Sequence, residues 1–262
     1  MRYFKGFIDI SNERDLPVLI HIRNARAISF RQLRLLLLLE GIEKTRRSAD
    51  WRVTRLQHHG LVERIEEDGF LGEPFFVITP NGLRVLESRG HSLVSLPSSA
   101  EQILHHSQVP HAIELVRIRL ALAQHGILRS WLSELEVSSR NTVLPAGESK
   151  DYDAVAEIVV DGQLRAVGIE YERTPKGATR YREIRQMLDR DKTVDVALYL
   201  ASDRNVLYLL ADEMRTAKKR VGIALSESFR QNPLDANTLL SGEESEVVPF
   251  RMIFAVPAVR NS

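Results

Sequence analysis

The 262-residue sequence contains no cysteine, so disulfide bonds and thiolate zinc sites are excluded, and a reducing compartment suits the chain. It also has no long hydrophobic run. The longest, residues 35–39, is far shorter than the roughly 20 residues that cross a bilayer. Residues 1–15 lack the apolar stretch of a signal peptide. We therefore expect a soluble cytoplasmic protein with no membrane partner.

The chain has little excess charge of either sign: 36 basic and 35 acidic residues give a formal charge of +1. This balance excludes a uniformly basic protein that coats nucleic acid, but it leaves room for a local basic patch. There is no glycine-rich phosphate loop, so nucleotide hydrolysis is not expected. Hydrophobic residues make up 44% of the chain, which is enough for a packed core.

Residues 29–89 have the order helix, helix, helix, hairpin, helix. Ser29 and Gln32 form a capping box that predicts the start of the first helix. Thr79 followed by Pro80 predicts the start of the last one. The helices are expected at residues 29–40, 44–48, 50–59 and 79–89, with two strands between residues 61 and 79.

Two stretches, "VTRLQHHGLVERIEED" and "FFVITPNGLRVLE", resemble the recognition helix, wing and following helix of bacterial winged-helix regulators. The resemblance implies that the third helix enters the major groove of duplex DNA. Arginine can contact a guanine edge and glutamine an adenine edge, while other arginines hold phosphates. The candidate DNA-binding residues are Arg46, Arg47, Arg52, Thr54, Arg55, Gln57 and His58.

A winged helix used only for protein contact remains an alternative, with the arginines as a solvated face. The wing itself is acidic, because five carboxylates lie within residues 63–73. Phosphates repel such a wing, so we expect recognition to depend on the helix rather than on the minor groove.

The second half of the chain alternates helices and strands. The expected helices lie at about residues 109–125, 177–191 and 205–220. A hairpin with Asp161-Gly162 as its turn, a buried strand at residues 195–202 and a last strand at residues 250–256 are also expected.

Three carboxylates are candidates for a shared site. In a hairpin with a two-residue turn at Asp161-Gly162, position 153 lies opposite position 170, which places Asp153 near Glu170. Glu172 lies on the same face as Glu170 because strand residues alternate faces. Such oxygens suit Mg²⁺, and an ion there could activate water for phosphodiester hydrolysis, with Lys176 or Arg180 neutralising developing charge.

The order of helix, Asp-bearing strand, Glu-bearing strand and helix resembles the PD-(D/E)xK nuclease fold. A winged helix followed by "KDYDAVAEI" and "IEYERTPKGATRYREI" is also similar to the replication-relaxation family of plasmids and integrative elements. The matching positions are Asp153, Glu170 and Glu172, with Glu114 in the place of a helical acid. Glu172 stands where that fold usually has lysine, and Tyr152 stands where it has proline.

Two other interpretations of the carboxylates remain open. Glu172 and the arginines after it could form exposed ion pairs that contribute little. The domain could also have lost activity and use its basic helix, residues 176–190, to bind nucleic acid or a protein. The adjacent pairs His58-His59 and His105-His106 do not favour a metal site, because neighbouring residues do not share a helix face.

The sequence thus predicts an α/β (α+β) protein: an N-terminal winged helix followed by a restriction-endonuclease-like domain. The expected function is sequence-specific DNA binding in plasmid or mobile-element replication or mobilisation, with a catalytic set of Asp153, Glu170, Glu172 and Lys176 for Mg²⁺-dependent cleavage. The partners are duplex DNA, a second copy, and a relaxase or replication protein. The alternative is a transcriptional regulator with a non-catalytic, dimerising C-terminal domain.

The expected divisions of the chain are an extension at 1–28, the winged helix at 29–90, a linker at 91–108 and the nuclease-like domain at 109–262.

Overall fold

The computed structural model describes residues 8–66, 73–93, 108–143, 149–242 and 246–255. The chain divides into two compact units, Met1–Val116 and Arg117–Ser262, and the division falls within helix α5 (Val109–Gln124) rather than in the predicted linker. Most of that linker lies outside the described residues. None of the helices in the described ranges has the length and hydrophobicity needed to span a membrane.

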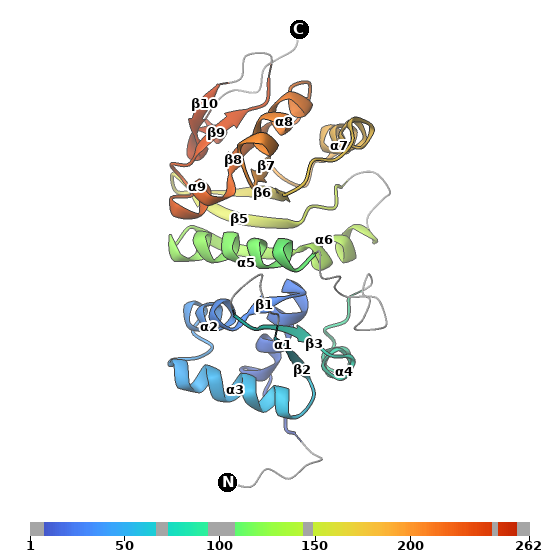
Figure 1. The fold of residues 1–262 in the computed structure, drawn as a ribbon, viewed down its shortest axis with the longest axis vertical. Helices are drawn as coiled ribbons and strands as arrows, with labels where there is room; N and C mark the ends of the chain where they lie inside the picture. The colour runs from blue at the N-terminus through green and yellow to red at the C-terminus, as the bar shows by residue number, and fades with distance from the viewer. Residues whose placement is uncertain (1–7, 67–72, 94–107, 144–148, 243–245, 256–262) are drawn as a thin grey trace. The chain divides into compact units, whose positions relative to one another are not determined.

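The first unit contains helices around a small antiparallel sheet, whose strand order is β1-β3-β2 (Figure 1). Ser29 and Gln32 form the predicted capping box at the start of α2, and Thr79 caps α4. The strands β2 and β3 form the predicted hairpin. The elements are α1 (Asp15–Ala25), β1 (Ile28–Ser29), α2 (Phe30–Leu39), α3 (Arg46–His58), β2 (Val62–Ile65), β3 (Phe75–Ile78) and α4 (Pro80–Ser88).

Two expectations for this unit are corrected by the structure. The helices predicted at residues 44–48 and 50–59 are one continuous helix, α3, because Thr45 and Ser48 form its capping box and nothing interrupts it afterwards. Residues 1–28 are not merely an extension. Helix α1 places Leu19 and Ile22, both fully buried, in the core of the unit. The three helices before the hairpin are therefore α1, α2 and α3.

The second unit is built on a seven-stranded mixed sheet with the order β10-β9-β8-β7-β6-β5-β4. The pairs β6–β7 and β7–β8 are parallel, and the others are antiparallel. Figure 1 shows α7 and α8 on the same side of this sheet. The elements after α5 are β4 (Leu128–Ser133), α6 (Glu134–Asn141), β5 (Ala154–Val160), β6 (Gln163–Glu172), α7 (Ala178–Arg190), β7 (Val196–Ala201), α8 (Arg204–Met214), β8 (Val221–Leu225), α9 (Ser226–Gln231), β9 (Asn237–Leu240) and β10 (Val247–Pro249).

The α/β class is confirmed, as are helix α7, strand β7 and the hairpin β5–β6. The last expected strand is wrong: residues Phe250–Phe254 form a 3₁₀ helix whose Phe250 and Ile253 side chains are buried. Helix α8 ends at Met214, and the chain then enters β8, which the sequence did not indicate. The core under α7 and α8 includes Tyr152, Tyr181 and Tyr199.

Candidate nucleic-acid interface and carboxylate cluster

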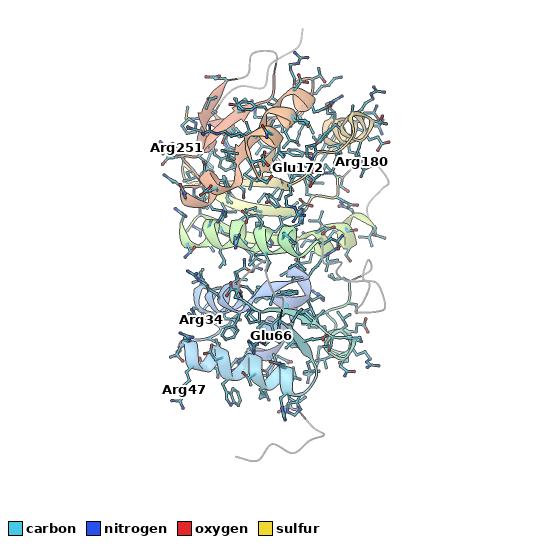
Figure 2. The ribbon with its side chains drawn as sticks, in the orientation of Figure 1. Arg34, Arg47, Glu66, Glu172, Arg180 and Arg251 are labelled. Carbon is cyan, nitrogen blue, oxygen red and sulfur yellow. The ribbon has the colours of Figure 1, made fainter. Side chains whose placement is uncertain are left out.

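The outer face of α3 carries a continuous exposed stripe. Arg47, Trp51, Thr54 and His58 are exposed, and their spacing of three or four residues puts them on one side of the helix. Figure 2 shows Arg47 projecting from this helix. Gln57, also exposed, lies beside the stripe. These are five neighbouring side chains, one of them cationic and one a half-exposed indole.

Arg46 lies at the start of α3 and is also exposed. Its Nε atom is 3.6 Å from Asp50 Oδ2, in an ion pair whose arginine is 73% exposed. Exposed pairs of this kind contribute little, so the guanidinium can exchange Asp50 for another anion at small cost.

Arg52 is not on the exposed face, which corrects the expectation that it reads DNA. Its side chain is buried between two carboxylates: Nη1 lies 2.6 Å from Asp15 Oδ1, and Nε donates to Glu43 Oε1. The pKa of Asp15 lies below its ordinary value. Burial alone would raise it, but hydrogen bonds from Arg55, the Ser11 amide and Arg52 outweigh burial. Arg52 is therefore a structural residue that joins α1 to α3.

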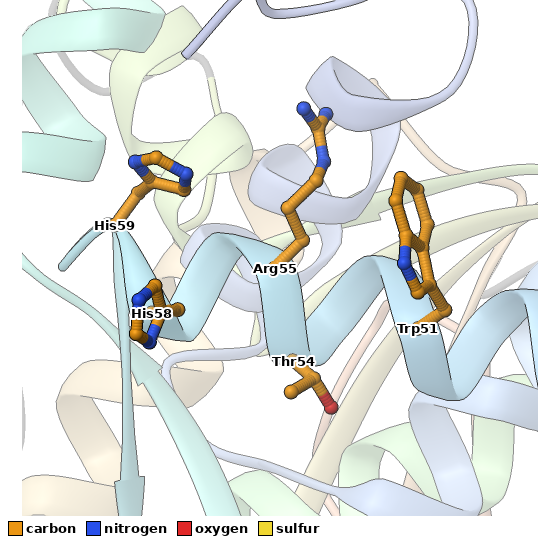
Figure 3. A pocket seen from close by; sticks show the side chains of 5 residues that line it. All are labelled: Trp51, Thr54, Arg55, His58 and His59. Carbon is orange, nitrogen blue, oxygen red and sulfur yellow. The ribbon is translucent and has the colours of Figure 1, made fainter. Parts of the chain in front are cut away.

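Arg55 shares this internal position. Its guanidinium donates to Asp15, and its Cζ atom lies 5.4 Å from the Trp51 ring centroid. Its side chain is only 15% exposed, so most of its surface is buried. Figure 3 shows how Arg55 and the surface residues of the same helix line a shallow pocket of about 210 Å³. Its lining residues are Trp51, Thr54, Arg55, His58 and His59.

The described part of the wing is acidic, as the sequence predicted. Glu63 and Glu66 are exposed, and Glu66 forms an ion pair of 2.9 Å with Arg64. Glu67 and Asp68, two more of the five predicted acidic residues, lie outside the described residues.

The predicted register of the second unit's hairpin is confirmed. Ala154 pairs with Ile169 and Val160 with Gln163, so Asp153 and Glu170 are the next opposed positions. The Asp153 side chain accepts a hydrogen bond of 2.8 Å from the Tyr171 amide, which holds it at the end of β6. Glu114, the predicted helical acid, is buried on α5 and belongs to the first unit.

Two lysines neutralise the glutamates. Lys150, whose side chain is 4% exposed, donates to Glu170 Oε1, and Lys176 donates to Glu172 Oε2. Burial raises the pKa of Glu170 to about 7; the ammonium of Lys150 opposes this shift and the nearby Asp153 adds to it. Glu172, labelled in Figure 2, is itself buried, so its pair with Lys176 is not the exposed ladder that one interpretation expected.

In this structure the three predicted Mg²⁺ ligands accept hydrogen bonds from other groups of the chain. Within the described ranges, no group of three His, Asp or Glu side chains is placed to hold a metal ion. Each acid already has a hydrogen-bond donor: Lys150 for Glu170, Lys176 for Glu172 and the Tyr171 amide for Asp153. An ammonium has no lone pair to offer a cation, and its charge opposes a second cation at the same oxygen.

The fold and these two sites define the class of protein. A small unit of helices α1–α4 and a three-stranded sheet is followed by a mixed α/β unit with a carboxylate–lysine cluster at a strand end. A family model described as replication-relaxation matches residues 19–188, and the chain belongs to that family.

Among solved structures, the chain is similar to the restriction endonuclease FokI, with 13% identity and a TM-score of 0.31. The alignment covers 92% of this chain and 44% of that one, and a likeness at this level carries no argument. No curated protein matches the chain.

Several residues of these sites were missed from the sequence. Asp15 and Glu43, the partners of Arg52, were not singled out, and neither was Lys150. The one available signal for Lys150 was its position three residues before Asp153, in the stretch "KDYD".

Proposed function

We propose that the chain binds duplex DNA sequence-specifically through α3 and acts in the replication or mobilisation of a plasmid or mobile element. The observation that carries this proposal is the exposed stripe of α3, where Arg47, Trp51, Thr54 and His58 share one face. Membership of the replication-relaxation family supports the DNA-linked role.

The roles on α3 follow from side-chain chemistry. Arg46 and Arg47, at the N-terminal end, contact phosphates, where each neutralised phosphate releases counterions. Gln57 reads a base edge, because its amide can both donate to and accept from adenine. Trp51 supplies an apolar surface for a thymine methyl or a deoxyribose. Arg52 has no part in this contact because its guanidinium is buried.

In this proposal the second unit does not cleave DNA, because Glu170 and Glu172 are each paired with a lysine. Its exposed basic side chains on and beside α7 suit contact with a nucleic acid backbone or with an acidic partner such as a relaxase. They include Arg173, Arg180, Arg182, Arg190 and Lys192.

The test begins with selection of bound sites from a pool of random duplexes by the full chain, followed by footprinting on the genomic region that contains the selected sequence. An enriched motif is expected, with protection at a replication or transfer origin. Gln57→Ala should relax the preference at one position of the motif by about 1–3 kcal/mol. Absence of any enriched motif would contradict the proposal, and a palindromic footprint confined to the promoter of its own gene would favour the transcriptional regulator.

A second assay tests the absence of cleavage. Supercoiled plasmid that carries the motif should remain intact with Mg²⁺ or Mn²⁺. Nicking by the wild-type protein that is lost in Glu170→Gln would show that the second unit is a nuclease after all.

A further inference from the structure

Lys150 has the surroundings of a bound cation. Its ammonium donates to Glu170 Oε1 and, at 3.2 Å, to the carbonyl oxygen of Asp151. It also lies 4.4 Å from the centroid of the Tyr152 ring, whose face attracts positive charge. Because the Lys150 side chain is only 4% exposed, its positive charge is balanced by protein groups rather than by water.

The segment that carries Lys150 is fixed on both sides. The side-chain amide of Asn141, at the end of α6, donates to the Lys150 carbonyl at 3.1 Å and to Asp151 Oδ1 at 2.8 Å. The next residue, Tyr152, is fully buried and donates its hydroxyl proton to Asp191 at 2.7 Å. Its ring packs so closely on Gly168 that a methyl group there would lie 2.5 Å from a ring carbon. The ammonium is therefore held in place by packed neighbours.

Two further oxygen-bearing side chains, Asp153 and Tyr199, lie near Glu170, the carboxylate that the ammonium contacts. Asp153 and Glu170 are opposed positions at the end of the hairpin, where side chains on the same face lie about 4.5–5.5 Å apart at Cβ. Tyr199 is paired with Glu170 in the β6–β7 register and is 1% exposed. Its hydroxyl has no hydrogen-bond partner in the described part of the chain, and burial together with the nearby Glu170 carboxylate raises its pKa well above the ordinary value.

We propose that Lys150 is a tethered cation that takes the position of a divalent ion between Asp153 and Glu170, and so keeps this site metal-free. Removal of the ammonium opens a site for Mn²⁺ or Mg²⁺, whose preferred ligands are carboxylate oxygens with water. The buried Tyr199 hydroxyl is available to accept a hydrogen bond from a water molecule of that ion. The inference does not depend on DNA binding by α3.

The physical reason is charge compensation in a buried site. Burial of an unpaired carboxylate costs free energy. Without Lys150, Glu170 is therefore stabilised by binding a proton or another cation. A divalent ion can supply that charge only when the ammonium is absent, because both would bind the same oxygen.

The experiment follows thermal unfolding of the full chain, with and without Mn²⁺, at pH 8. The unfolding midpoint of the wild type should not respond to Mn²⁺. Lys150→Met should lower the midpoint, and Mn²⁺ at about one hundred times its Kd should raise it again by about 5 °C. The double variant Lys150→Met/Glu170→Gln should lose that response.

The matched control is Arg180→Met. Arg180 also pairs with a glutamate, Glu183, at 2.9 Å, but both side chains are more than half exposed. This variant should show neither a large loss of stability nor a response to Mn²⁺, because water compensates the carboxylate that remains.

Three results would overturn the proposal. The first is a wild-type protein that binds Mn²⁺ in a titration and loses this binding in Glu170→Gln. The second is a response in Lys150→Met that survives in the double variant. If Lys150→Met does not fold, the double variant should still fold, because it removes both charges. The third overturning result is therefore a double variant that is no more stable than Lys150→Met.

Discussion

The buried arginine of α3 offers the sharpest test of how the first unit is built. Substitution of Arg52 by methionine keeps most of the side-chain volume but removes the guanidinium between Asp15 and Glu43. All three residues are at most 5% exposed, so water cannot replace the lost contacts. Removal of one partner from a buried ionic network typically costs about 3–5 kcal/mol. Asp15 keeps its bond to Arg55, so the lower end of this range is expected.

The pH dependence separates lost charge from lost packing. The pKa values of Asp15 and Glu43 both lie below their ordinary values, because hydrogen bonds outweigh the opposite effect of burial. In the wild type these carboxylates therefore stabilise the fold above about pH 4.5, and this contribution is lost as the pH falls through their lowered pKa values. Without Arg52 their pKa values rise, so Arg52→Met should lose less stability at pH 5 than at pH 7.

The assay is urea denaturation followed by circular dichroism at both pH values. Arg47→Met is the matched control, since it removes an exposed arginine from the same helix and should change stability by less than about 0.5 kcal/mol. Equal, small effects of the two substitutions would refute the assignment of Arg52 to the core.

Three further substitutions test other parts of the fold. Thr79→Ala removes the N-cap of α4, where Oγ1 accepts from the Gly82 amide at 3.1 Å, and should cost about 1–2 kcal/mol in denaturant unfolding. Gly168→Ala forces a methyl group against the Tyr152 ring and should cost about 1–3 kcal/mol; a neutral result would mean that the ring moves freely. Glu170, whose pKa is raised to about 7, should make wild-type stability fall between pH 5 and pH 8 by up to about 3 kcal/mol, and Glu170→Gln should remove this slope.

The hairpin of the second unit was predictable because its turn determines its register. Asp161 and Gly162 both have positive φ, 49° and 76°, as a two-residue hairpin turn requires. With that turn in place, the opposition of positions 153 and 170 follows by counting. Helix α7 was equally readable, because Tyr181, Ile184 and Leu188 recur at helical spacing and are all buried.

Other parts were not predictable because they depend on contacts between distant segments. Helix α1 buries Asp15, whose side-chain partners Arg52 and Arg55 lie 37 and 40 residues further along the chain. Likewise, Lys150 and Glu170 are 20 residues apart, and strand alternation says nothing about a lysine that precedes the strand. The stretch "FRMIFAV" looks like a strand, but packing of Phe250 and Ile253 favours a 3₁₀ turn.

The measurement that tests the central claim most directly is the salt dependence of binding to the selected duplex. Wild type, Arg47→Ala and the control Arg84→Ala would be compared by fluorescence anisotropy; Arg84 is an exposed arginine of α4. If α3 contacts phosphates, Arg47→Ala should weaken binding to all sequences and reduce the slope of log K against log salt by about 1, while Arg84→Ala leaves both unchanged. Equal affinities and slopes for all three proteins would contradict DNA binding through α3.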